Sequence, residues 1–569
     1  MDLANRVKIA RGAAPAELAL RNARLINVFT SEIYTTDILI SDTRVVALGQ
    51  GYEAQESMDL GGRYVCPGFI DAHVHIESSM VPPREFARAV LPHGVTTVVT
   101  DPHEIANVLG LEGIRFMLQD AKYNPLSMYV NAPSCVPATN METSGAQLEF
   151  YDLATLLMDP WVLGLAEVMN YPGVVKGDQR VLSKIQTFSG RIVDGHAPGV
   201  SGKELNAYVA AGVMSDHECT TVAEALEKLR LGMTIFIREA TTAHNLRDLL
   251  PLVTPENAAR VCFCTDDRHP QDLVNEGSID HLIRLAVSAG LDPLLAIRMG
   301  TLNAAEYFRL HDRGAVAPGR LADLVVFSDL HDLRPELVFR YGRVVARDGQ
   351  VLPWERPERK TKARGTINIK ADDLRFTIPA EGKRIRVIGV VPDQLATLHL
   401  IEPAHVVDGQ VAADPDHDLT KVAVVERHFG TGNVGLGFAR GLGLKRGALA
   451  STVAHDHHNI VVTGVDDLSM ETAVRAIAAA QGGMAVAQGK DVLALMPLPI
   501  AGLMSDQPID VVCAQHEKLQ RAAHDLGSPL HDPFMALSFL ALSVIPSLKI
   551  TDKGLVDVDH FQLVPLFVE

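Results

Sequence analysis

The sequence predicts an α/β protein built on a (β/α)8 barrel of the TIM type, with a small β-sandwich-like domain and a C-terminal α+β domain. Three observations carry this prediction. Eight short apolar runs recur through the middle of the chain, helical stretches separate them, and strand-rich segments flank the region on both sides. At 569 residues the chain is also longer than one hydrophobic core usually organises, so several domains are expected.

The first part of the small β domain is expected over residues 1–64. The apolar runs Ile38–Ile40 and Val45–Leu48 flank the turn residues Ser41 and Asp42, a pattern typical of a hairpin. The same texture returns in residues 313–358, where ADLVVF and GRVVARDGQVL indicate strands with glycine turns. We therefore expect the two segments to build one domain together.

The catalytic barrel is expected over residues 65–312. Alternating strands and helices predict parallel βαβ units, and eight of them close a barrel of ~250 residues. Each run ends in His, Asp, Glu or Asn, which places these side chains at the face where barrels of this type hold their active sites. The eight runs are FIDAHVHIES, GVTTVVTDPHE, SMYVNAPSC, WVLGLAEVMN, RIVDGHAPG, VMSDHECT, MTIFIREAT and VCFCTDDRHP.

Residues 359–569 show mixed helix and strand patterns and predict the separate α+β domain. Its GTGNVG segment resembles a nucleotide-binding loop. It lacks the GK[ST] ending of a phosphate-binding loop and the βαβ context of a dinucleotide site, so we interpret it as a set of turns.

Composition narrows the possible partners. The formal charge of −17 argues against a nucleic-acid partner, because phosphate contacts need clustered Lys and Arg. The beginning of the chain has no apolar signal core, and the apolar stretch Met535–Leu548 is shorter than the ~20 residues of a membrane span. We expect a cytoplasmic protein without a membrane partner that forms a homo-oligomer.

A metal site is predicted at the barrel mouth. His73 and His75 lie two residues apart at the end of the first run, so both imidazoles project to the same side of a strand. An HxH pair alone is a weak signal, but ligand-type residues end four further runs and should converge on the same mouth. These are Glu167, His196, His217 and Asp266.

These residues bring a family resemblance into view. FIDAHVHIES is similar to the first-strand signature of the amidohydrolase superfamily, and the order of ligands matches it through residues 66–312. Within that superfamily LAEVMN, DGHAPG, SDHE, CTDDRHP and the C-terminal ERHFGTGNVGLGFARGLGLKRGALASTVAHDHHNIVVTG resemble the adenine deaminases. The resemblance implies hydrolytic deamination of adenine, a small-molecule purine, to hypoxanthine and ammonia at a binuclear metal site.

One departure from the common binuclear pattern concerns the bridging ligand. Many relatives bridge two metals with a carbamylated lysine on the fourth strand, whereas here the fourth run offers Glu167, whose two oxygens can bridge in the same way. We assign His73, His75 and Asp266 to one metal, His196 and His217 to the other, and Glu167 to both. Two divalent ions per chain are expected, Fe or Mn, with Zn as a further option.

Asp266 and Glu239 are the candidates for proton transfer. Asp266 would carry protons from hydroxide to the departing ammonia, and Glu239, at the end of the seventh run, would protonate the purine ring nitrogen. Glu239 could instead pair with Arg238 or with a lysine of a loop.

Other polar residues at the strand ends have less specific expectations. Asp101, His103 and Glu104 could orient a ligand histidine, contact the substrate, or only form a turn and helix cap. Asn131 and Ser134 could line the purine pocket.

The alternatives concern both the substrate and the presence of catalysis. HDHHN (455–459) is either a second metal site or a polar loop at an interface. The same metal-containing barrel could hydrolyse a cyclic or acyl amide, with Arg238 or Arg268 binding the substrate. A barrel that has lost catalysis is a third possibility, but this chain keeps all the candidate ligands.

Overall fold

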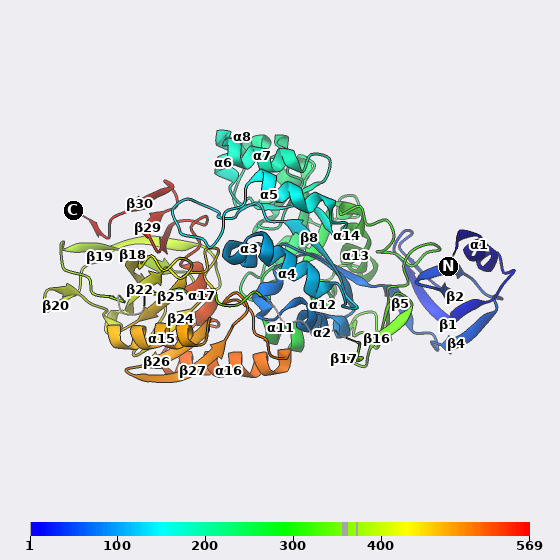
Figure 1. The fold of residues 1–569 in the computed structure, drawn as a ribbon. Coiled ribbons are helices and arrows are strands. Elements are labelled where there is room, and N and C mark those ends of the chain that lie inside the picture. The colour runs from blue at the N-terminus through cyan, green and yellow to red at the C-terminus, as the bar shows by residue number, and fades with distance from the viewer. Residues whose placement is uncertain (1, 356–361, 371–373, 569) are drawn as a thin grey trace.

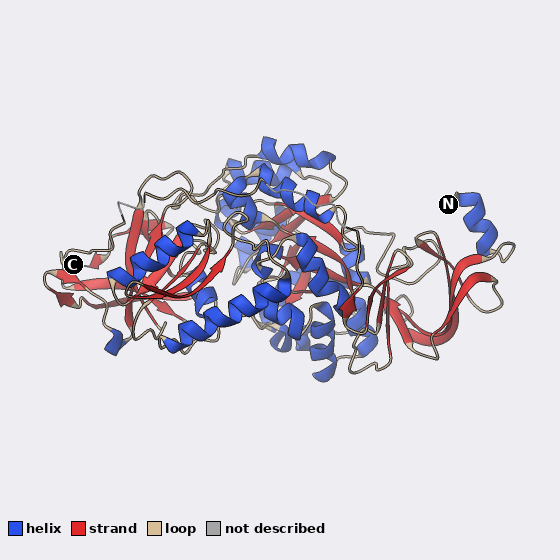
Figure 2. Ribbon diagram, turned by 60° about the horizontal axis from the view of Figure 1, so that its bottom comes forward, coloured by secondary structure: helices blue, strands red, loops and turns tan. Residues whose placement is uncertain are grey.

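A computed structural model describes residues 2–355, 362–370 and 374–568. Three parts follow one another along the molecule: a small sheet at the N-terminal end, a central barrel, and a C-terminal domain on the opposite side (Figure 1; Figure 2). The expected boundary between residues 358 and 359 lies outside the described residues, as do the chain ends at residues 1 and 569.

Strands from both sides of the barrel build the small β domain. They form a nine-stranded sheet in the order β17-β16-β15-β14-β5-β1-β2-β3, with β4 paired to β1. Strand β5 links the halves by pairing with β1 and with β14. One apolar cluster is shared by both halves, so the sheet closes around a core as a sandwich-like domain does. The elements are α1 (Leu3–Ala10), β1 (Ala16–Asn27), β2 (Glu32–Ser41), β3 (Arg44–Leu48), β4 (Ala54–Asp59), β5 (Tyr64–Pro67), β14 (Leu324–Phe327), β15 (Leu337–Arg340), β16 (Arg343–Arg347) and β17 (Gln350–Val351).

The predicted barrel is confirmed, because each of the eight apolar runs contains one strand. The strands pair in parallel as two hydrogen-bonded sets, β6 to β10 and β11 to β13. Their bounds are β6 (Phe69–Val74), β7 (Val95–Thr100), β8 (Ser127–Ala132), β9 (Val162–Val168), β10 (Ile192–Gly195), β11 (Ser215–Asp216), β12 (Thr234–Arg238) and β13 (Val261–Cys264).

Backbone hydrogen bonds join the two sets into a ring. The amide of Met214 donates to Val193 O over 2.9 Å on one side. On the other side the Asp266 amide donates to His73 O over 3.0 Å, and the His75 amide donates to Asp266 O over 3.3 Å. The first and last strands therefore meet at residues that were expected to bind metal.

Helices cover the outside of the barrel (Figure 2). In α9 the Thr221 hydroxyl caps the N-terminus by accepting from the Glu224 amide, and basic residues occupy the last turn. The helices are α2 (Pro83–Val90), α3 (His103–Leu109), α4 (Leu111–Ala121), α5 (Phe150–Ala154), α6 (Tyr171–Lys176), α7 (Gln179–Thr187), α8 (Gly202–Ala210), α9 (Val222–Arg230), α10 (Leu246–Leu249), α11 (Pro270–Asn275), α12 (Ile279–Ser288), α13 (Pro293–Met299) and α14 (Leu302–Tyr307), with 3-10 turns at Ile76–Ser79, Leu91–His93, Thr155–Met158, Leu250–Leu252 and Ala258–Arg260.

The C-terminal domain is α+β, as predicted. Its main sheet has the order β19-β18-β23-β22-β25-β24-β26-β27, with β31 paired to β18, and the GTGNVG segment forms the turn between β22 and β23. The elements are β18 (Arg384–Val390), β19 (Thr397–Pro403), β20 (Val406–Val407), β21 (Gln410–Val411), a 3-10 turn (Pro415–His417), β22 (Leu419–Val425), β23 (Val434–Arg440), β24 (Ala448–Ser451), β25 (Ile460–Gly464), α15 (Asp467–Ala479), β26 (Gly483–Gln488), β27 (Asp491–Pro497), α16 (Ile509–Asp525), α17 (Pro533–Phe539), β28 (Leu548–Thr551), β29 (Gly554–Asp557), β30 (Gln562–Val564) and β31 (Phe567–Val568).

The C-terminal domain packs against the side of the barrel that carries the strand ends. Asn459, between β24 and β25, donates from Nδ2 to Thr143 O over 2.8 Å. His516 of α16 lies 2.8 Å from Gln271 Oε1 through its Nδ1. Among the described residues, no helix combines the length and apolar character needed to cross a membrane.

Candidate active site

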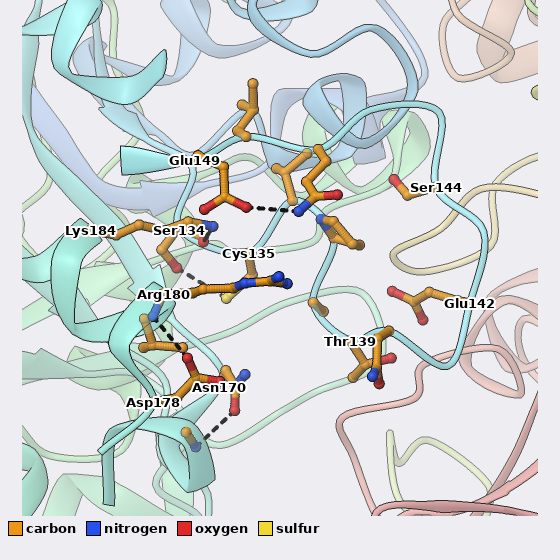
Figure 3. Close-up of a pocket in the computed structure, with 18 of the residues that line it drawn as sticks. Ser134, Cys135, Thr139, Glu142, Ser144, Glu149, Asn170, Asp178, Arg180 and Lys184 are labelled. Atoms are coloured by element: carbon orange, nitrogen blue, oxygen red, sulfur yellow. Dashed lines mark hydrogen bonds between the residues drawn. The ribbon is translucent and has the colours of Figure 1, made fainter. Parts of the chain in front are cut away.

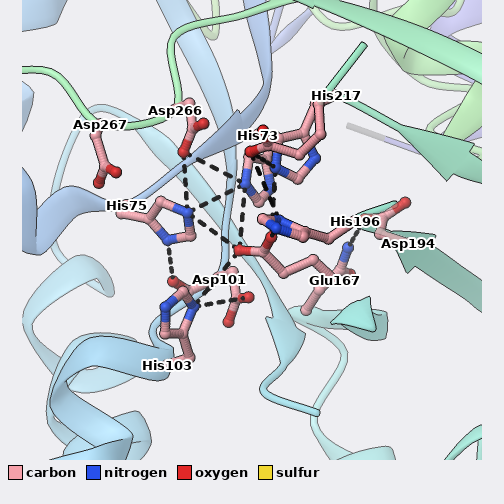
Figure 4. A network of polar contacts seen from close by, with 12 residues as sticks. His73, His75, Asp101, His103, Glu167, Asp194, His196, His217, Asp266 and Asp267 are labelled. Carbon is pink, nitrogen blue, oxygen red and sulfur yellow. Dashed lines mark hydrogen bonds and ion pairs between the residues drawn. The ribbon is translucent and has the colours of Figure 1, made fainter. Parts of the chain in front are cut away.

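The six candidate ligands converge at the mouth of the barrel (Figure 4). They come from the ends of five strands, and each is between 2% and 6% exposed. His73 lies in β6 with His75 directly after it, Glu167 lies in β9, and His196, His217 and Asp266 follow β10, β11 and β13. The parallel strands place all these side chains at one end of the barrel.

Glu167 lies between two pairs of histidines. Its Oε1 is 3.3 Å from His75 Nε2 and 3.7 Å from His73 Nε2. Its Oε2 is 2.6 Å from His196 Nδ1 and 3.3 Å from His217 Nε2. Each carboxylate oxygen therefore faces a different pair, which is the arrangement that a bridging ligand needs.

Asp266 completes the first pair and is anchored from behind. Its Oδ1 lies 3.1 Å from His75 Nε2, while its Oδ2 accepts a hydrogen bond of 2.8 Å from Arg238 Nη1. Its φ of 57° is left-handed, a region that Asp tolerates better than most residues. This backbone turn directs the carboxylate toward the histidines.

The sequence analysis missed Glu218 as a member of this cluster. Its Oε1 lies 3.6 Å from His196 Nδ1 and 3.6 Å from His217 Nε2, and both of its oxygens bind the Arg238 guanidinium. Its position beside His217 in SDHE was the available signal. Arg238 thus neutralises two acids, one on each side of the cluster.

The donor set fits divalent cations. His73 Nε2 and His75 Nε2 face each other at 3.2 Å, and His196 Nε2 is buried without a hydrogen-bond partner among the described residues. Ligand atoms separated by such distances can share an ion at ~2.0–2.2 Å from each, as in imidazole and carboxylate sites. The candidate ligands offer nitrogen and oxygen but no thiolate, which suits Fe, Mn or Zn.

Mutual charges hold the carboxylates in their ionised form. Burial raises the pKa of Glu167, but the hydrogen bond and charge of His196 outweigh burial and hold this pKa well below its usual value. Burial likewise opposes ionisation of Asp266, and His75 and Arg238 reverse the effect. Burial and the neighbouring His217 lower the pKa of His73. The site thus presents anionic carboxylates and a neutral imidazole, the forms in which these groups bind metal.

Asp101 and His103 lie beneath the histidine pair. Asp101 O lies 3.0 Å from His75 Nδ1, and Asp101 Oδ2 lies 3.1 Å from His103 Nδ1. Since His75 directs its Nε2 toward Glu167 and Asp266, the contact at Nδ1 fixes the orientation of its ring. Asn131 instead donates from Nδ2 to Asp194 Oδ2 over 2.5 Å, deeper in the barrel.

The structure does not bring the carboxylate of Glu239 to the ligand cluster. Its Oε1 lies 2.9 Å from His244 Nδ1, and its Oε2 accepts from the Leu246 amide over 3.2 Å. Both oxygens are thus engaged with the loop after β12. The expected pairing with Arg238 is absent as well, because that guanidinium binds Glu218 and Asp266.

A cavity of about 830 Å³ adjoins the site on the side of β8 and β9 (Figure 3). The loop after β8 and helices α6 and α7 line it, with Arg180 and Lys184 among the labelled side chains. Ser134 belongs to this lining and donates from Oγ to Glu167 O over 2.5 Å. The cavity therefore begins directly beside the backbone of the central carboxylate.

Comparisons with known proteins agree across both large domains. The amidohydrolase family model matches residues 64–345, and the model of the adenine deaminase C-terminal domain matches residues 394–562. The chain is 51% identical to an adenine deaminase of Desulfatibacillum aliphaticivorans over 99% of both chains. It is 50% identical to adenine deaminase 2 of Carboxydothermus hydrogenoformans over 98% of both. Among solved structures, dihydropyrimidinase of Brevibacillus agri aligns at 15% identity with 59% of this chain and 96% of its own, with a TM-score of 0.46.

Glu167→Ala tests the central position of this carboxylate. Because each oxygen faces a different histidine pair, we expect the variant to lose most of its metal after loading with Mn²⁺, measured as ions per chain by mass spectrometry. Bicarbonate should not restore the metal, because the site offers a carboxylate in place of a lysine to carbamylate. Glu204→Ala, an exposed acid of α8, is the matched control. Two ions per chain in Glu167→Ala would contradict the assignment.

Proposed function

The chain belongs to the adenine deaminase family of amidohydrolases, and on this premise we propose that it hydrolyses adenine to hypoxanthine and ammonia. The observation that carries the proposal is the convergence of four histidines, Glu167 and Asp266 at one end of the barrel. The similarity to adenine deaminases over nearly the whole chain supports the choice of substrate.

The six residues supply the ligands for two divalent cations, Fe or Mn ahead of Zn. His73, His75 and Asp266 would hold one ion, His196 and His217 the other, and Glu167 both. Such a pair of ions supplies hydroxide at neutral pH by lowering the pKa of water.

Asp266 is placed to carry a proton between water and the leaving group. Its Oδ2 is fixed by Arg238, whereas its Oδ1 faces the histidine pair, so one oxygen remains directed at the reacting centre. One water enters at C6, the bond from C6 to the exocyclic nitrogen breaks, and the proton taken from water leaves with ammonia. Asp101 holds His75 in the orientation that this arrangement requires.

Hydrolysis of a cyclic or acyl amide is the rival activity on this scaffold. A substrate carboxylate would need an unpaired arginine, yet Arg238 binds Glu218 and Asp266, and Arg268 pairs with Glu276. Both arginines that the sequence offered for that role are engaged, which favours the neutral purine.

We also propose that the enzyme works in the cytoplasm as a homo-oligomer, without a nucleic-acid or membrane partner. Light scattering behind a sizing column measures the oligomeric state directly.

A comparison of two substrates tests the function. The chain is loaded in turn with Fe²⁺, Mn²⁺ or Zn²⁺, and ammonia release from adenine is measured beside ring opening of dihydroorotate. We expect one ammonia for each hypoxanthine and no ring opening. Ring opening without ammonia, at two ions per chain, would overturn the proposal in favour of amide hydrolysis.

Asp266→Asn separates proton transfer from ligand geometry. The amide keeps the shape of the side chain but cannot accept a proton, so kcat for adenine should fall by about 10²-fold or more. The metal content must be measured in the same preparation, so that loss of an ion is not mistaken for loss of the proton carrier. A change confined to KM would show that Asp266 only helps to hold the substrate.

Glu239→Gln tests whether the loop contacts of Glu239 describe its role. Since both oxygens bind the 239–246 loop, we expect kcat for adenine to fall less than about tenfold at full metal content. A positioned acid contributes about 10²-fold to 10⁴-fold, so a loss of that size would restore Glu239 as the donor to the ring nitrogen.

A further inference from the structure

A segment of the C-terminal domain enters the mouth of the barrel. His455, in the loop between β24 and β25, places its Nδ1 2.6 Å from Oε1 of Glu104, which lies at the start of α3. His458 contacts Oε2 of the same carboxylate. All three side chains are at most 5% exposed. The sequence showed both groups without showing that they meet.

His458 fixes Glu104 from one side. Its Nδ1 accepts a hydrogen bond of 3.2 Å from the Ala454 amide, so in the neutral ring the proton resides on Nε2, facing Glu104 Oε2. The other oxygen is thereby left for His455. This arrangement orients the His455 ring through its Nδ1, as a carboxylate orients a catalytic imidazole.

The opposite nitrogen of His455 is unused. His455 Nε2 is buried and has no hydrogen-bond partner among the described residues. A buried polar nitrogen without a partner is unfavourable, and a contact that only joined two domains would not require it. An imidazole held at one nitrogen and free at the other is suited to a ligand that arrives later.

His455 also lies close to the metal ligands. His103 Nε2 is 3.4 Å from Glu104 Oε1, and His103 Nδ1 is 3.7 Å from Glu167 Oε1. Three short contacts thus lead from His455 to the central carboxylate. Besides Glu104, the charged groups around His455 are Asp267, after β13, and Asp456 and His458 of its own segment, and the ring of Phe539 in α17 packs at 5.5 Å between centroids.

We propose that His455 donates the proton that the purine ring nitrogen takes up when hydroxide adds to C6, an inference that rests on the proposed deamination. As the bond from oxygen to C6 forms, the π electrons between C6 and N1 move to N1, which takes the proton from His455 Nε2. The amine then leaves with the proton carried by Asp266. The carbonyl forms as the C6 hydroxyl loses its proton, and one proton returns His455 to its charged form.

The charge state of His455 agrees with this role. Burial alone lowers the pKa of an imidazole, but the charge of Glu104 outweighs burial and raises the pKa of His455 to about 9. The ring therefore carries its proton at neutral pH. Glu104 and His458 are positioning residues, because they act on the substrate only through His455.

His455→Gln removes the proposed donor, and His457→Gln is the matched control. His457 is buried in the same segment, and its Nδ1 accepts from the Asn459 amide rather than facing Glu104. In the Mn²⁺-loaded full chain, we expect kcat for adenine to fall by about 10²-fold to 10⁴-fold in His455→Gln, with unchanged metal content and a smaller change in KM. His457→Gln should stay within a few-fold of the wild type.

Glu104→Gln tests the link from the barrel side through a pH profile. The donor must be protonated, so kcat/KM of the wild type should decline as pH rises through about 9. The neutral amide no longer stabilises the imidazolium, which lowers the pKa of His455 and moves this decline to lower pH. A merely structural defect would reduce the whole profile without moving it, and that result would contradict the proposal.

Two further outcomes would overturn the inference. Near-normal kcat in His455→Gln would reduce the segment to a contact between domains. Loss of one ion per chain in His455→Gln, but not in His457→Gln, would show a cation among His103, Glu104, His455 and Asp456. Failure of the wild type itself to release ammonia from adenine would instead remove the proposed function, so the two failures are distinguishable.

Discussion

Closure of the barrel between its first and last strands is the constraint on which the site depends. The backbone hydrogen bonds at this seam run between Asp266 and the two residues His73 and His75, so the atoms that close the ring belong to the ligands themselves. A small opening of the seam would separate Asp266 from both imidazoles at once. Site geometry and barrel integrity are thus a single property, which favours the tight positioning that catalysis requires.

Charge balance is the second constraint, because the acids of the site lie away from water. Glu167 relies on histidines, whereas Asp266 and Glu218 share the buried guanidinium of Arg238. A buried charge without a partner destabilises a protein strongly, so removal of Arg238 would affect both sides of the cluster. The histidines, by contrast, can exchange a carboxylate contact for a metal ion.

The sequence was sufficient for the barrel and for the convergence of its ligands, because strand period and chain order decide both. His73 and His75 had to share a face, and residues at the ends of parallel strands had to meet. The direction of Glu239 could not be predicted, because it depends on how residues 239–246 fold back on its carboxylate. The contact of His455 with Glu104 lies further out of reach, since it requires the docking of two domains whose local patterns are independent.

The composite sheet has a consequence for how the chain is made. Strand β5 must pair with β14, so Cys66 finds Val325 only after the whole barrel has left the ribosome. Until then the edge of β5 that later binds β14 has no partner, a state in which strands from different chains can associate. Barrel closure brings residues 67 and 324 together and shortens the loop that this pairing must close. Synthesis thus gives the catalytic barrel a second task as the scaffold on which the N-terminal sheet is completed.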